Sequence, residues 1–244
     1  MQPKSIDFAV LFPPNMNYEY FEGYESIPFK PEASGKCHLP TAWWLAEISL
    51  LAYEHPGFVK WVLRHIKASH LRYFSWDTTQ LITFILNEYC IVAFRGTEIK
   101  SPKSFHDIIS DMNINMTDFY GMGRVHQGFK LAFDETLDPK NNLFSHIDSL
   151  LQSGLAKKVI FTGHSMGGSL ATLSAAWYGR AGHEQTPLYT YGAMRVGNED
   201  FNAYLPKDVF RFVNNGDPFP YLPTNFPKSG KGKNTYANHG QVLF

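Results

Sequence analysis

The segment Gly163-His164-Ser165-Met166-Gly167 constrains this chain more than any other stretch. It has the pattern G-x-S-x-G, and it lies between an apolar strand-like run at 159–162 and a helical stretch at 168–178. A serine on so sharp a strand-to-helix turn has a strained backbone, and only small neighbours fit around it. The alternative is a glycine-rich turn that binds a phosphate, or binds nothing. The strand before and the helix after favour a nucleophilic serine.

Strand and helix patterns alternate along most of the chain. We expect strands at 81–86, 90–94, 159–162, 188–191 and 209–213, and helices at 41–53, 56–68, 105–111, 128–151 with a break at Pro139, and 168–178. This alternation predicts an α/β fold with a mostly parallel central sheet flanked by helices. We expect a single domain over residues 1–244, in which 1–39 form an irregular N-terminal arm.

The order of residues along the chain selects partners for Ser165. In hydrolases with this serine turn, an acid follows the serine and a histidine follows the acid. Only His183 and His239 follow Ser165. Catalytic groups lie beyond the carboxyl ends of parallel strands, which excludes Asp208 before the strand 209–213 and favours Asp217 after it. The sequence therefore predicts Ser165 as nucleophile, Asp217 as acid and His239 as base.

This trio has a chemical logic. His239 would accept the proton of Ser165 and return it to the leaving alcohol, while Asp217 would orient the imidazole. We interpret His164 and His126 as structural residues. No cluster of ligands has metal-binding spacing, so no metal or other cofactor is expected.

Acyl transfer also needs hydrogen-bond donors that stabilise the oxyanion of the tetrahedral intermediate. The backbone N–H of Met166 is one candidate, because it follows the nucleophile. Thr97, in the segment 95–97 after the strand 90–94, is the second candidate, and an ordinary turn is the alternative for that segment.

Six segments, in this order, resemble the class 3 lipase family, the fungal triacylglycerol lipase type of α/β-hydrolase. They are Val92–Thr97, Val125–Phe129, Thr162–Ala171, Tyr191–Asn198, Arg211–Pro218 and His239. The resemblance implies the same triad, an oxyanion hole of Thr97 and Met166, and a lid helix near 105–112. Met194 departs from the family pattern, which usually has proline there.

The predicted lid has an apolar face of its own. Phe105, Ile108, Ile109 and Met112 follow the spacing i, i+3, i+4 and i+7. The alternative is a surface helix that packs permanently on the core.

Charge and composition limit the partners. The chain has 22 basic and 22 acidic residues, so it offers no long-range attraction to nucleic acid or an anionic membrane. We expect a lipid or other ester as substrate, transient contact with a lipid surface and no nucleic acid. The sequence shows no signal peptide or membrane span, which favours a cytoplasmic location or export by another route.

Three function classes remain. The first is a triacylglycerol lipase or carboxylesterase that forms an acyl-enzyme, and the second is a phospholipase or galactolipase that acts on membrane lipids. The third is a binding module that has lost catalysis, which a complete triad argues against.

Overall fold

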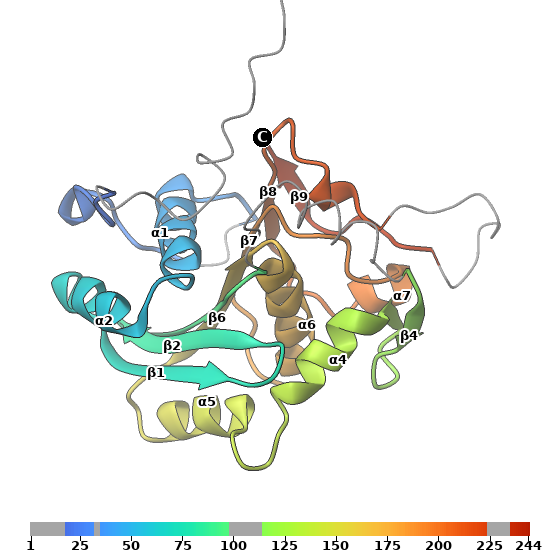
Figure 1. The fold of residues 1–244 in the computed structure, drawn as a ribbon, viewed down its shortest axis with the longest axis horizontal. Helices are drawn as coiled ribbons and strands as arrows, with labels where there is room; N and C mark the ends of the chain where they lie inside the picture. The colour runs from blue at the N-terminus through green and yellow to red at the C-terminus, as the bar shows by residue number, and fades with distance from the viewer. Residues whose placement is uncertain (1–17, 32–34, 98–113, 224–234) are drawn as a thin grey trace, which may run out of the picture.

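A seven-stranded sheet in the order β1-β2-β3-β6-β7-β8-β9 forms the centre of the protein (Figure 1). The computed structural model describes residues 18–31, 35–97, 114–223 and 235–244. The strands β1, β2 and β3 pair antiparallel with one another, and the pairs from β3 through β6, β7 and β8 to β9 are parallel. The prediction of a mostly parallel sheet flanked by helices is confirmed.

The strands of this sheet are β1 (Ser69–Ser75), β2 (Gln80–Leu86), β3 (Tyr89–Phe94), β6 (Lys158–His164), β7 (Leu188–Tyr191), β8 (Val209–Phe212) and β9 (Gln241–Leu243). A separate hairpin consists of β4 (Met116–Asp118) and β5 (Arg124–His126). The helices are α1 (Leu39–Leu51), α2 (Pro56–His65), α4 (Gln127–Glu135), α5 (Leu143–Gln152), α6 (Met166–Arg180) and α7 (Glu199–Asn202), with short 3-10 turns at Tyr24–Ser26 and Phe219–Tyr221.

Alternate residues of the central strands enter two separate cores, because successive side chains of a strand point to opposite faces. On β3, Ile91 and Ala93 face the side covered by α1 and α2. Val92 and Phe94 face the side covered by α4, α5 and α6. Helices on both faces explain why β3 is buried along its whole length, and why it reads as a continuous apolar run.

The described part of the N-terminal arm is packed against α1. Phe21 is 1% exposed, and its ring lies 5.2 Å from that of Trp44 on α1. Glu47, also on α1 and buried, accepts a hydrogen bond from the backbone N–H of Phe21. This part of the arm therefore completes one face of the core.

Several elements differ from the sequence-based expectation. The helical region at 128–151 is two helices, α4 and α5, separated at 136–142. The strands β1, β4, β5 and β9 were not predicted. Helix 105–111 lies outside the described residues. Within the described ranges, no helix has the length and apolarity needed to cross a membrane.

Candidate active site

Ser165 lies on the sharp turn between β6 and α6, at the carboxyl edge of the sheet. Its backbone has φ 56° and ψ −128°, a region that costs a non-glycine residue about 1–3 kcal/mol. The N–H of Ser165 donates to the carbonyl of Tyr191 at 2.8 Å, and the carbonyl of Ser165 accepts from Gly168 at 3.0 Å. The turn is therefore held from both sides, as the G-x-S-x-G pattern predicts for a nucleophile.

Glycine is required at two positions around this turn. A Cβ on Gly163 would lie 2.5 Å from the carbonyl carbon of Gly167, and a Cβ on Gly167 would lie 2.3 Å from the carbonyl oxygen of Phe94. Both contacts are with backbone, which cannot move without displacing a strand or the start of α6. The small residues of the motif thus allow β3, β6 and α6 to approach closely.

We expect Gly163→Ala to lower the free energy of unfolding by about 1–3 kcal/mol, because the added methyl group overpacks this turn. Urea denaturation followed by circular dichroism would measure the loss. Gly57→Ala, in the first turn of α2, is the matched control because its nearest contact would be an ordinary 3.4 Å. An equally stable Gly163→Ala protein would contradict the close packing.

The two predicted oxyanion-hole residues lie next to each other. The hydroxyl of Thr97 is 3.6 Å from the sulfur of Met166. Met166 is the first residue of α6, so its backbone N–H belongs to the positive end of the helix dipole. An oxyanion formed at Ser165 would meet donors and a favourable field there.

Tyr53, which was not singled out in the sequence, links the oxyanion loop to the serine turn. Its hydroxyl accepts a hydrogen bond from the backbone N–H of Gly96 and lies 2.9 Å from Nδ1 of His164. Gly96 and His164 are the neighbours of Thr97 and Ser165 in the sequence. No sequence motif marks Tyr53, because it follows α1, far from both partners along the chain.

Asp217 also lies at the carboxyl edge of the sheet, in the loop after β8. Its Oδ1 accepts a hydrogen bond from the N–H of Phe219 at 2.9 Å. Its Oδ2 lies 3.0 Å from where a Cβ on Gly192 would be, just beyond the end of β7. Burial raises the pKa of this carboxyl group, and the Phe219 N–H opposes that shift. Asp217 thus lies at the same edge of the sheet as Ser165.

His239 comes just before β9, and the residue before it contacts the loop that follows β7. Nε of Arg195 donates to the side-chain carbonyl of Asn238 at 3.0 Å. The charge of Arg211, whose guanidinium donates to the carbonyl of Ala193 beyond the end of β7, acts on the imidazole of His239. The role of His239 as the base stays a prediction.

The imidazole of His239 has an unusual environment. Its side chain is buried, and neither ring nitrogen has a hydrogen-bond partner among the described residues. Burial and the charge of Arg211 lower the pKa of His239 to about 3. Catalytic hydrogen bonds are often completed only when substrate binds, so these contacts do not decide the role of His239.

The other histidines near this edge have structural contacts. Nδ1 of His126 accepts from the N–H of Phe129 and so caps α4, as expected for a structural residue. His164 bonds to Tyr53. No histidine in the described ranges hydrogen-bonds to Ser165. The described residues therefore hold the predicted nucleophile, acid and oxyanion donors at one edge of the sheet, and the predicted base has no hydrogen bond to any of them.

Ser165 opens into a cleft of about 390 Å³ between the carboxyl edge of the sheet and α4. Met166, Phe129, Ala132, Met194 and Phe219 line it, together with Thr97 and His126. Most of this lining is apolar, which suits an acyl chain. The predicted lid residues Phe105, Ile108, Ile109 and Met112 lie outside the described residues.

Comparison with known proteins agrees with this geometry. A secreted mono- and diacylglycerol lipase of Fusarium solani is 34% identical over 102 residues, which cover 41% of this chain and 29% of that protein. The lipase MDL3 of Malassezia globosa, also a secreted mono- and diacylglycerol lipase, is 32% identical over 145 residues, covering 54% of this chain and 46% of its own. The chain thus spans less than half the length of these curated relatives.

Solved structures show the same fold. The crystal structure of a lipase from Rhizopus microsporus var. chinensis superposes with a TM-score of 0.62 at 28% identity, over 82% of this chain and 75% of that one. This match identifies the architecture as the α/β-hydrolase fold. The model of the family described as lipase (class 3) matches residues 91–226, more than half of the chain. On this evidence, the chain belongs to the class 3 lipase family.

Proposed function

We propose that this protein is a serine hydrolase that cleaves carboxylic esters of lipids. Ser165 attacks the ester carbonyl, and the N–H of Met166 and Thr97 stabilise the oxyanion. Asp217 orients the imidazole of His239, which takes up the proton of Ser165 and returns it to the leaving alcohol. The observation that carries the proposal is the strained Ser165 at the start of α6, which opens into an apolar cleft. A strained residue persists only where its surroundings enforce it, and such positions cluster at active sites.

A substrate panel combined with active-site labelling tests this proposal. Short and long p-nitrophenyl esters, a triacylglycerol emulsion and phospholipid vesicles cover the ester classes. A serine-directed alkyl phosphonate is expected to modify Ser165, and peptide mass spectrometry would locate the label. Labelling at a different serine, or hydrolysis that persists in Ser165→Ala, would overturn the proposal.

The predicted lid remains part of this proposal. A helix with one apolar face could cover the cleft in water and enlarge the apolar surface at a lipid interface. Higher specific activity above the solubility limit of the substrate would support it.

Tyr53→Phe is expected to lower kcat about tenfold while KM stays unchanged. The variant removes the acceptor for the Gly96 N–H, which positions the oxyanion loop next to Thr97. Loss of a group that acts only in the transition state lowers kcat and kcat/KM equally. Steady-state kinetics on a soluble short-chain ester would measure this. Tyr73→Phe, which loses only a bond to the carbonyl of Pro56, is the control.

A further inference from the structure

A second pocket lies beside the catalytic cleft, and it is polar. Its volume is about 420 Å³, and its lining is Ile114, Asn115, Met116, Thr117, Arg124 and Gln127. The hairpin strand β5 borders both spaces: His126 lines the cleft, and Arg124 and Gln127 line the polar pocket. Arg124 and His126 are two residues apart on one strand, so they are about 7 Å apart and on the same face.

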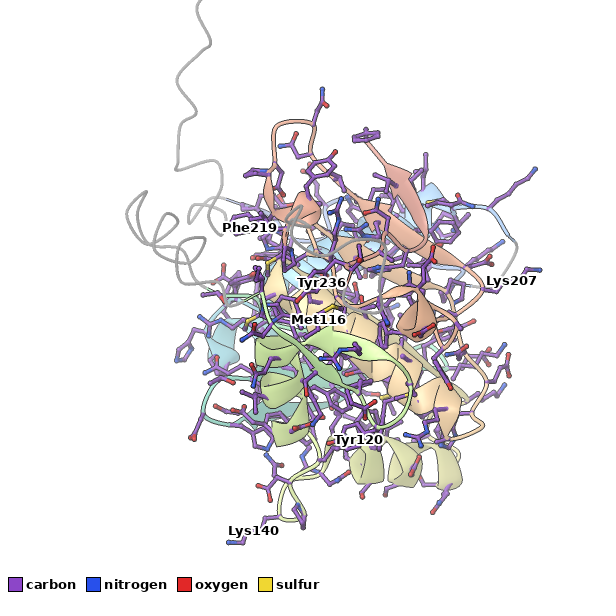
Figure 2. All side chains as sticks on the ribbon, turned by 90° about the vertical axis from the view of Figure 1, so that its right-hand side faces the viewer. Met116, Tyr120, Lys140, Lys207, Phe219 and Tyr236 are labelled. Carbon is purple, nitrogen blue, oxygen red and sulfur yellow. The ribbon has the colours of Figure 1, made fainter. Side chains whose placement is uncertain are left out.

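The buried Tyr236 lies at the boundary of the two spaces. Its ring is 6.3 Å from that of His126, and its hydroxyl donates to the carbonyl of Ile114 at 3.2 Å. Figure 2 labels Tyr236, Met116 and Phe219. Tyr236 thus contacts one residue of the cleft lining, His126, and one of the pocket lining, Ile114, which places the two spaces next to each other.

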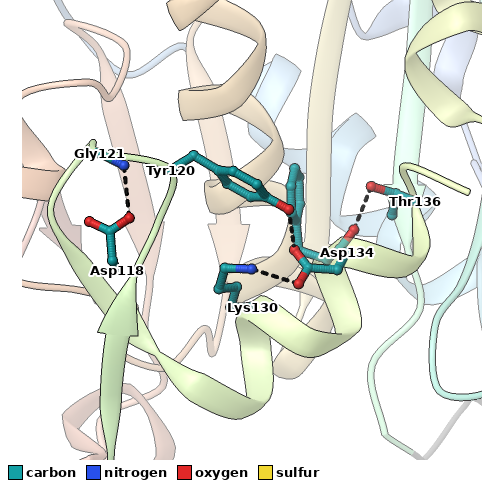
Figure 3. A network of polar contacts seen from close by, with 7 residues as sticks. Asp118, Tyr120, Gly121, Lys130, Asp134 and Thr136 are labelled. Atoms are coloured by element: carbon teal, nitrogen blue, oxygen red, sulfur yellow. Dashed lines mark hydrogen bonds and ion pairs between the residues drawn. The ribbon is translucent and has the colours of Figure 1, made fainter.

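Arg124 has no acidic partner among the described residues. Its guanidinium donates to the carbonyl of Met116, and its Nε is buried with no hydrogen-bond partner. Two carboxylates are close by, but both are engaged elsewhere. Asp118 pairs with Arg124 in the β4–β5 register, yet its carboxylate accepts from the N–H of Gly121 at 3.0 Å (Figure 3). Asp200 accepts from the side chain of Asn198.

The Arg124 guanidinium makes no ion pair with a carboxylate of the described residues, and an anion in the pocket would supply charge-assisted acceptors for its remaining N–H groups. Arginine matches the geometry of phosphate through two parallel N–H donors. We propose that this polar pocket binds the phosphate of a glycerophospholipid while an acyl ester of the same molecule lies at Ser165. The inference rests on the proposed function, and it narrows the substrate class of that site.

Binding to the Ser165→Ala variant tests the pocket without turnover. The probes are dihexanoyl phosphatidylglycerol and dihexanoylglycerol, both as monomers, with glycerol 3-phosphate and inorganic phosphate as separate arms. Calorimetry is expected to show at least about tenfold tighter binding of the phospholipid than of the diacylglycerol. The two phosphates without acyl chains are expected to bind weakly, because the apolar cleft contributes nothing to them.

In Ser165→Ala, the further change Arg124→Gln is expected to remove the preference, and Arg124→Lys to retain part of it. Arg180→Gln, an exposed arginine at the end of α6, is the control and is expected to leave the preference intact. A second variant tests the same pocket without removing Arg124, in case Arg124→Gln does not fold. Gln127→Glu places a carboxylate in the pocket at the first residue of α4, where negative charge stabilises a helix, and it is expected to weaken phospholipid binding alone.

Equal affinity for the two lipids, or a preference that survives Arg124→Gln, would overturn the inference. Inorganic phosphate binding as tightly as the phospholipid would also overturn it, in favour of a site for the free anion. Hydrolysis of neutral esters without any phosphate preference would leave the proposed function in place and reject only this pocket. Tighter binding of the phospholipid, by a protein whose wild type hydrolyses no ester, would reject the proposed function and leave the phosphate pocket in place.

Discussion

Ser165→Ala is expected to reduce kcat on a soluble short-chain ester by about 10³-fold or more. In the proposed mechanism the hydroxyl oxygen of Ser165 attacks the ester, and the oxyanion donors alone would retain only a small part of the rate enhancement. The fold is expected to persist, because alanine is smaller than serine and the turn is fixed by backbone hydrogen bonds. Initial rates and a thermal unfolding curve would be measured on the same preparation.

Ser165→Gly separates catalysis from strain. Glycine adopts positive φ without penalty, so this variant is expected to be about 1 kcal/mol more stable than Ser165→Ala while equally inactive. Ser169→Gly, in the regular part of α6, is the control, and it is expected to be less stable than the wild type. If Ser165→Gly is no more stable than Ser165→Ala, the serine turn is not strained.

His239→Leu is expected to remove most of the acid sensitivity of the fold. The folded pKa of His239 is about 3, well below the unfolded value of about 6.5. The unfolded state therefore binds a proton that the native state does not, and stability falls as pH drops from about 6.5 towards 3. At pH 4 this amounts to roughly 3 kcal/mol. Urea unfolding of both proteins at pH 7 and pH 4 would measure the difference.

At pH 7 the same variant is expected to be as stable as the wild type or more so, since both ring nitrogens of His239 lack partners. His70→Leu, at an exposed position on β1, is the control that leaves the pH dependence in place. Esterase activity of His239→Leu decides the catalytic question. A loss comparable to that of Ser165→Ala would support His239 as the base, and retention of the wild-type rate would contradict that role.

The sequence predicted the serine turn and its neighbouring strands well, because local chemistry dictates them. The strand expected at 188–191 is β7, and the helix expected at 168–178 is the centre of α6. Continuous apolar runs on buried parallel strands and glycines at a tight turn are strong local signals. The edge strand β1 gave no such signal, since most of its residues are exposed.

The surroundings of His239 could not be predicted from the sequence. Chain order indicates which histidine is available, but not which groups surround it. The three-residue strand β9 is largely exposed and carries no recognisable pattern, yet its parallel pairing with β8 fixes the chain that follows His239. Tyr53 was missed for a related reason, because its contacts with Gly96 and His164 join segments that are distant in the chain.

The hydrogen bond from the Ser165 N–H to the carbonyl of Tyr191 has a consequence for biosynthesis. The meander β1-β2-β3 pairs neighbouring segments and can form early as the chain leaves the ribosome. The serine turn needs β3 on one side and β7 on the other, and β7 is synthesised after α6. We therefore expect the strained backbone of Ser165 to form only after β7 has docked. The reactivity proposed for this serine would then appear late, once the parallel half of the sheet has assembled.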